Sequence, residues 1–219
     1  VMSFKATVIA VIVLISSSAA MAQSFQDNFD GSSLDASKWN RAGGGTLTVA
    51  GGFASSEAAC GEFFPYARTL SDPFPASGDF IVTVGFRYTA PSGGGNGFGN
   101  PDFTLGSAGS LIWVWQDACC GGLRAACGER VITLAGYPDA GYHIYQWQYL
   151  SGTYFLYVDG ALVTSDTTSR RPSGFFFGHP PAYPYCGWSS QQIDFVTITS
   201  AQPTTTSRRS WSSVKAVYR

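Results

Sequence analysis

The sequence has little charge and almost no helical periodicity. Charged residues make up 12% of its 219 residues, and 13 Lys and Arg against 14 Asp and Glu give a formal net charge of -1. Such a chain has no electrostatic attraction to nucleic acid or to an anionic membrane surface, so we expect neither as a partner. Its composition is also unlike that of a coiled coil, a helical bundle or a disordered chain. No repeat of about 20–50 residues indicates a propeller or a solenoid.

The first 22 residues have the three parts of a secretory signal peptide. Lys5 precedes an apolar run over residues 6–15, and Ala20-Met21-Ala22 forms an A-x-A cleavage site. The apolar run is shorter than the roughly 20 residues that span a bilayer. The sequence therefore predicts cleavage after Ala22 and a mature chain that is secreted or held at the cell surface, without a membrane span.

Export would allow disulfide bonds among the five cysteines, which are Cys60, Cys119, Cys120, Cys127 and Cys186. Cys119 and Cys120 are adjacent and would pair only with strain. We therefore expect one of them to bond Cys127 across a short loop, and Cys60 to bond Cys186. A zinc site is the alternative, but the sequence lacks the C-x-x-C pair that favours one.

Aromatic residues and glycine are abundant, at 15% of the chain and 26 residues respectively. They occur in short apolar runs separated by turn residues, a pattern typical of an all-β sandwich of two antiparallel sheets. We predict one such domain over residues 23–199, with the glycine-rich segment 90–101 as a loop without an element. The predicted strands cover residues 25–29, 46–50, 63–70, 79–89, 103–105, 110–116, 131–134, 142–150, 154–158, 161–164, 174–178 and 193–199.

One β-hairpin is the strongest local signal in the chain. Two apolar runs flank Asp159-Gly160, and Asp-Gly is favoured in a two-residue type I′ turn because both turn residues need positive φ. Alternation places Tyr154, Leu156 and Val158 on one face of the first arm. We interpret Asp159 as a turn residue rather than a catalytic acid.

Three stretches together resemble the concanavalin A-like lectin/glucanase superfamily, which includes LamG-like modules and family 16 glycoside hydrolases. They are FQDNFDGSSLDASKWN at residues 25–40, YHIYQWQYLSGTYFLYVDGALV at 142–163 and QIDFVTI at 192–198. The resemblance implies a two-sheet antiparallel jelly roll with a concave face across which glycans bind. It is specific for the fold and not for a function, because the superfamily contains hydrolases, lyases, lectins and structural modules.

The chain departs from the hydrolases of this superfamily because it lacks their E-x-D-x-x-E strand. Retaining glycoside hydrolysis uses two carboxyl groups about 5–5.5 Å apart. The comparable strand, residues 111–117, carries two tryptophans and a single carboxylate at its end. We therefore predict a non-catalytic module with no catalytic residue. The alternative is a glycoside hydrolase-like enzyme whose atypical carboxylates come from Glu57, Glu62 or Asp117.

An aromatic platform is the predicted ligand site, because the apolar faces of sugar rings stack on Trp and Tyr. The ligand would be a polysaccharide or another glycan. Aromatic residues that alternate along strands are also typical of a sandwich core, which is the competing interpretation. The candidates are Tyr88, Trp113, Trp115, Tyr145, Trp147, Tyr149 and, in a loop, Trp188.

Two further features are left. The resemblance implies a structural Ca²⁺ where the first and last strands meet, with Asp30 and Asp194 as ligands, and no other cofactor. Residues 200–219 form a Pro/Thr/Ser linker and a short peptide in which Trp211, Val214 and Tyr218 would line one side of a helix. A surface or assembly partner for residues 210–219 would make the chain an extracellular structural protein, which is the third functional hypothesis.

Overall fold

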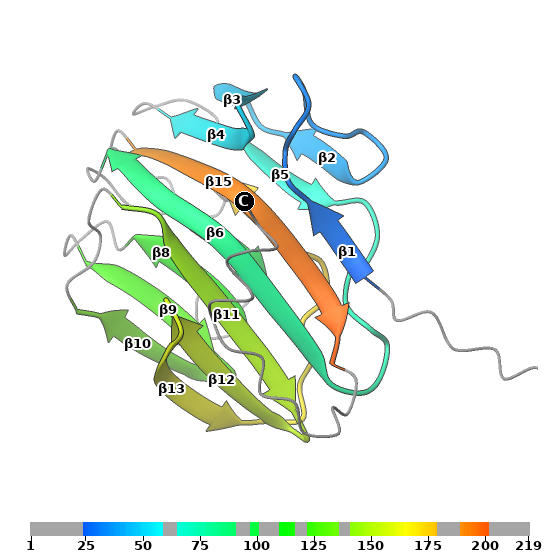
Figure 1. Cartoon of the computed structure of the whole chain (residues 1–219), viewed down its shortest axis with the longest axis vertical. Coiled ribbons are helices and arrows are strands. Elements are labelled where there is room, and N and C mark those ends of the chain that lie inside the picture. Colours follow the sequence, from blue (N-terminus) through cyan, green and yellow to red (C-terminus); the bar gives the residue numbers. More distant parts are fainter. Residues whose placement is uncertain are drawn as a thin grey trace, which may run out of the picture.

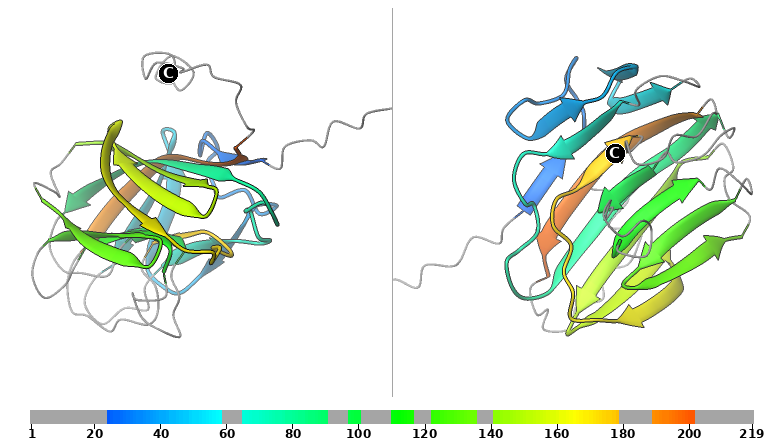
Figure 2. Two further views of the ribbon diagram at one scale, coloured as in Figure 1. Left: turned by 90° about the horizontal axis from the view of Figure 1, so that it is seen from below. Right: turned by 180° about the vertical axis from the view of Figure 1, so that it is seen from behind.

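The structure is a computed structural model, and it describes residues 24–58, 65–90, 97–100, 110–116, 122–135, 141–178 and 189–201. Its strands form two antiparallel sheets packed face to face, as the two layers of Figure 2 show. The predicted all-β sandwich is confirmed. The predicted signal peptide, strand 103–105 and the C-terminal peptide lie outside the described residues. No described helix is long and apolar enough to cross a membrane.

The first sheet, sheet A, has β6 (Phe80–Ala90) and β15 (Ser189–Ser200) at its centre (Figure 1). β1 (Ser24–Asp27) also pairs with β15. The order from one edge to the other is β13 (Ala161–Thr167), β12 (Thr153–Val158), β11 (His143–Leu150), β6, β15, β4 (Phe53–Ala58) and β3 (Thr46–Ala50).

The second sheet, sheet B, has seven strands and packs against the inner face of sheet A. Its order is β10 (Arg130–Leu134), β9 (Leu123–Cys127), β8 (Ile112–Gln116), β7 (Gly97–Asn100), β14 (Phe176–Gly178), β5 (Tyr66–Thr69) and β2 (Trp39–Ala42).

The core between the sheets follows the alternation in the sequence. In β6 every second side chain from Phe80 to Tyr88 lies in this core, and Thr83 and Gly85 on the other face are buried as well. The indole N–H of Trp147 in β11 donates to the carbonyl of Ala126 in β9 at 2.9 Å. This hydrogen bond crosses from one sheet to the other and fixes their relative position.

The predicted hairpin is β12 and β13. Asp159 and Gly160 have φ values of 50° and 84°, as a type I′ turn requires. The Asp159 carboxylate accepts from the backbone N–H of Ile144 at 2.9 Å and lies 2.7 Å from Nδ1 of His143. The turn residue therefore attaches the hairpin to the start of β11.

Replacing Gly160 with Val tests this turn. A β-branched residue at a φ of 84° clashes with its own backbone, so we expect a loss of about 1–2 kcal/mol in the free energy of unfolding. Urea denaturation measures it. A Gly160→Asn variant tolerates positive φ and should lose less, and unchanged stability in Gly160→Val would contradict the turn assignment.

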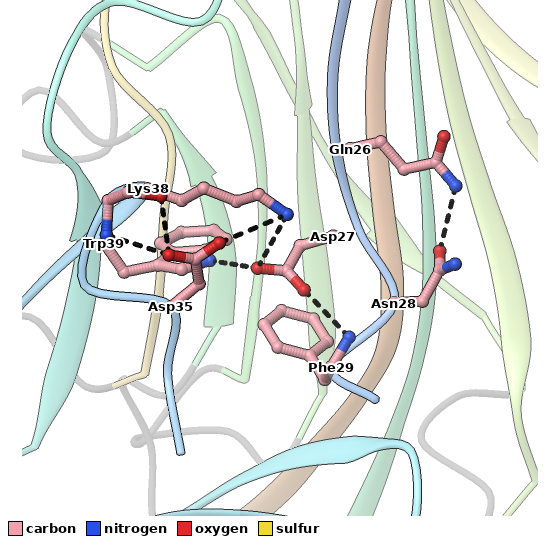
Figure 3. A network of polar contacts seen from close by, with 8 residues as sticks. Gln26, Asp27, Asn28, Phe29, Asp35, Lys38 and Trp39 are labelled. Atoms are coloured by element: carbon pink, nitrogen blue, oxygen red, sulfur yellow. Dashed lines mark hydrogen bonds and ion pairs between the residues drawn. The ribbon is translucent and has the colours of Figure 1, made fainter. Parts of the chain in front are cut away.

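A polar network attaches the turn at residues 32–39 to the end of β1 (Figure 3). The Asp27 carboxylate accepts from Nε1 of Trp39 at 2.7 Å and from the backbone N–H of Phe29 at 2.9 Å. Nζ of Lys38 lies 3.8 Å from Asp27 and 3.6 Å from Asp35. Trp39 is thereby held in the core.

Four strands lie where none was predicted, and the first two are β2 and β4. The segment 90–101, predicted to be a loop, contains β7, in which Phe98 is fully buried between the sheets. The cysteine-rich segment contains β9. The errors at β7 and β9 have the same cause. Interior strands of a sheet are fixed by pairing with their neighbours, and this pairing overrides the weak strand preference of a sequence such as GFGN.

The prediction for Cys127 was also wrong, because Cys127 is a free thiol buried on the inner face of β9. Burial raises the pKa of this thiol to about 12, with a smaller contribution from the charge of Asp166. The other four cysteines lie outside the described residues.

Candidate functional site

The outer face of sheet B presents two rows of side chains that run across its seven strands. Cross-strand partners project to the same side of a sheet, so the pairing register defines each row. The first row is Asn40, Arg68, Phe176, Gly99, Trp113, Ala126 and Val131. The second row is Ala42, Tyr66, Gly178, Gly97, Trp115, Arg124 and Thr133.

Trp113 and Trp115 lie on this face, because they alternate along β8 with Ile112 and Val114, which point into the core. Their rings stack with centroids 4.4 Å apart, and they form a hydrophobic cluster with Phe176 that is separate from the inter-sheet core. Their exposed fractions are 1% and 8%. The predicted open platform is therefore wrong for these two residues, since neither indole has a free face for a sugar ring.

The predicted roles of four other aromatic residues are also corrected. Tyr88, Tyr145, Trp147 and Tyr149 point between the sheets and are buried in the core. Desolvation raises the pKa of the Tyr88 hydroxyl well above its usual value, with a further contribution from Tyr145. These residues stabilise the fold, as the competing interpretation held. Trp188 lies outside the described residues.

A groove of about 440 Å³ lies on the outer face of sheet B, over β5, β14 and the loops next to them. Its lining includes the half-buried ring of Tyr66, the exposed guanidinium of Arg68 and the side chain of Leu70, which is 54% exposed. Phe176 also lines it and joins the groove to the tryptophan cluster. The volume lies in the range of about 300–1,000 Å³ that is typical of small-ligand sites.

The groove residues were not predicted as site residues, although residues 63–70 were correctly predicted to contain a strand. In β5 the small residues Ala67 and Thr69 face the core, and the larger Tyr66 and Arg68 face outward. The alternation of large outward and small inward residues is the signal in the sequence that could have located the groove.

Carboxylates are absent from the two rows. Glu57, one of the predicted alternative acids, lies on β4 of sheet A and is exposed there. Glu62 and Asp117 lie outside the described residues. The described part of the sheet B face therefore holds no pair of carboxyl groups of the kind that glycoside hydrolysis uses.

The predicted calcium ligands, Asp30 and Asp194, are close enough to interact. Partial burial raises the pKa of Asp194, and the charge of Asp30 raises it further. Two carboxylates that repel each other suit a hard divalent cation, which would relieve the repulsion. Among the residues that the structure describes, no group of three or more His, Cys, Asp or Glu side chains gathers in one place.

Comparison with solved structures identifies the fold. A Bacillus licheniformis β-glucanase superposes with a TM-score of 0.60 at 14% identity, over 83% of this chain and 100% of that one. The chain has a concanavalin A-like jelly-roll fold. The likeness that its sequence showed to this superfamily is confirmed at the level of the jelly roll.

Two other solved structures share the jelly roll. A sialidase matches with a TM-score of 0.63 at 14% identity, over 82% of this chain and 19% of the sialidase. The Crh5 transglycosylase in complex with NAG matches with a TM-score of 0.58 at 15% identity, over 83% of this chain and 86% of that one. No family model and no curated protein matches the sequence.

Proposed function

We propose that this jelly roll is a secreted or cell-surface module that binds a carbohydrate without cleaving it, and that the glycan lies in the groove over β5 and β14. The observation that carries the proposal is the combination of Tyr66, Arg68 and Leu70 in one groove on the outer face of sheet B. An aromatic ring, an apolar wall and a few polar groups are the parts of a typical sugar site.

The fold and the charges of this face support the proposal. Solved structures with the same fold include proteins named as a glucanase, a sialidase and a transglycosylase. The lack of carboxylates in the two described rows favours binding over hydrolysis.

The test replaces Tyr66 with Ala and measures binding by affinity electrophoresis in gels that contain single polysaccharides, both neutral and acidic. Loss of ring stacking should weaken binding by about tenfold. Tyr142→Ala is the matched control, because Tyr142 is a 38% exposed tyrosine that does not line the groove. No retardation of the wild-type chain by any polysaccharide would overturn the proposal, and so would equal retardation of the wild type and Tyr66→Ala.

Release of reducing sugar distinguishes the enzyme alternative. A binding module leaves the polysaccharide intact on prolonged incubation. Release that disappears in Glu62→Gln or Asp117→Asn would replace the proposal with a glycoside hydrolase-like function.

A calcium ion held by Asp30 and Asp194 is the second part of the proposal. We expect millimolar CaCl₂ to raise the melting temperature by a few degrees, because an ion that binds the folded state stabilises it. Asp194→Asn should abolish this rise, whereas Glu57→Gln, which removes an exposed carboxylate of the same sheet, should retain it.

The opposite result has a distinct signature. A carboxyl with a raised pKa in the folded state binds its proton more tightly there, so stability falls as the pH rises through this range. If no cation binds, CaCl₂ has no effect, and Asp194→Asn is more stable than the wild type at neutral pH. The difference in stability between the wild type and Asp194→Asn then disappears at a pH below the usual pKa of an aspartate.

A further inference from the structure

We propose that the groove selects acidic glycans and that Arg68 sets this preference. The inference rests on the proposed carbohydrate-binding function and names the chemical class of the ligand, a sugar that carries a carboxylate or a sulfate group. It follows from three observations. They are the lack of a side-chain partner for the Arg68 guanidinium, the distribution of charge around it and its position next to Tyr66.

The Arg68 guanidinium is exposed at the groove and is not used by the fold. Its register partners across the sheet are Asn40 in β2 and Phe176 in β14, and neither carries a charge. Among the described residues, Arg68 makes no side-chain hydrogen bond, ion pair or ring contact. The planar fork of an arginine binds a carboxylate or a sulfate through two parallel N–H···O bonds.

The charged side chains in the two rows have one sign. The two rows contain two arginines, Arg68 and Arg124, and no Asp or Glu, although the whole chain has a formal net charge of -1. Asp72 lines the same groove, but its Oδ1 accepts from the backbone N–H groups of Phe74 at 3.0 Å and of Gly174 at 3.3 Å. Asp72 thus places one carboxylate at the rim of the groove, where it holds the loops. It forms no ion pair with Arg68, whose guanidinium is left for a ligand.

The position of Arg68 fits one sugar unit. Tyr66 lies two residues before it in β5, so both side chains project from the same face of the same strand. A pyranose ring that stacks on Tyr66 can direct an equatorial carboxylate or sulfate group toward the neighbouring guanidinium. A neutral sugar would gain the stacking and leave the guanidinium unpaired.

The experiment compares acidic polysaccharides with chemically neutralised counterparts in affinity electrophoresis. The probes are polygalacturonate and its fully methyl-esterified form, chondroitin sulfate and its desulfated, carboxyl-reduced form, and a neutral β-glucan. We expect the acidic member of a pair to bind about tenfold more tightly than the neutral one. Arg68→Gln should remove this difference, Arg68→Lys should retain part of it, and added salt should weaken it.

A charge-matched control separates recognition from general attraction. Arg170→Gln removes the same charge from an exposed residue after β13 that forms an ion pair with Glu129 at 3.6 Å, and it should bind like the wild type. Equal binding of the acidic and neutral members would overturn the acidic preference and leave the carbohydrate proposal standing. If Arg68→Gln and Arg170→Gln lose the preference for acidic polysaccharides to the same extent, the role of Arg68 is overturned. If no probe binds, both proposals fail.

Discussion

Replacing Gly99 with Ala is expected to destabilise the domain by about 3 kcal/mol or more, the largest effect of any substitution proposed for this chain. Gly99 is in β7, an interior strand of sheet B, with a φ of 134°. A Cβ atom at this position would lie 2.0 Å from the carbonyl oxygen of Ile112 and 2.7 Å from the Cα of Trp113. Both are backbone atoms of the neighbouring strand, so β7 and β8 would have to separate.

Gly152 provides the matched control. It also has a positive φ, of 84°, but a Cβ atom there would meet nothing within 4 Å. Gly152→Ala should therefore lower the free energy of unfolding by only about 1 kcal/mol, because it introduces backbone strain but no clash. Urea denaturation of the two variants measures the difference. If both variants lose a similar free energy of unfolding, the backbone of β8 does not constrain β7. The close packing of β7 against β8 would then be contradicted.

Replacing Asp27 with Ala is expected to lower the free energy of unfolding by about 2–4 kcal/mol. The substitution leaves two buried donors, Nε1 of Trp39 and the backbone N–H of Phe29, without their acceptor. Asp27→Asn retains one acceptor oxygen and should lose less. Thermal unfolding followed by tryptophan fluorescence measures the loss and also reports the environment of Trp39.

Asp35→Ala is the control for the charge of this network. Asp35 also pairs with Lys38, but it is exposed, and its other partner is Ser37. If Asp35→Ala destabilises the chain as much as Asp27→Ala does, the ion pairs with Lys38, and not the buried acceptor, hold the turn in place.

The sequence predicted the fold through features that are local. Alternation from Phe80 to Tyr88 and the Asp159-Gly160 turn each depend on neighbouring residues, and both are confirmed. β7 was missed because its pairing partners, β8 and β14, lie elsewhere in the chain. Local preference carries no information about such partners.

The candidate site was harder to predict for a related reason. Alternation shows that Trp113 and Trp115 share a face, but it does not show whether that face is covered. The same pattern describes a binding platform and a second hydrophobic cluster, and these two residues form the cluster. The groove at Tyr66 and Arg68 depends on β5 and β14, which are far apart in the sequence and adjacent in sheet B.

The central position of β15 affects the order in which the domain can form. β15 is the last described strand of the chain, yet it pairs with β6, with β4 and with β1, the first described strand. During synthesis these three strands remain without their shared partner until residues 189–200 have emerged. Sheet A is therefore completed in a late, long-range step that follows the synthesis of the other described strands.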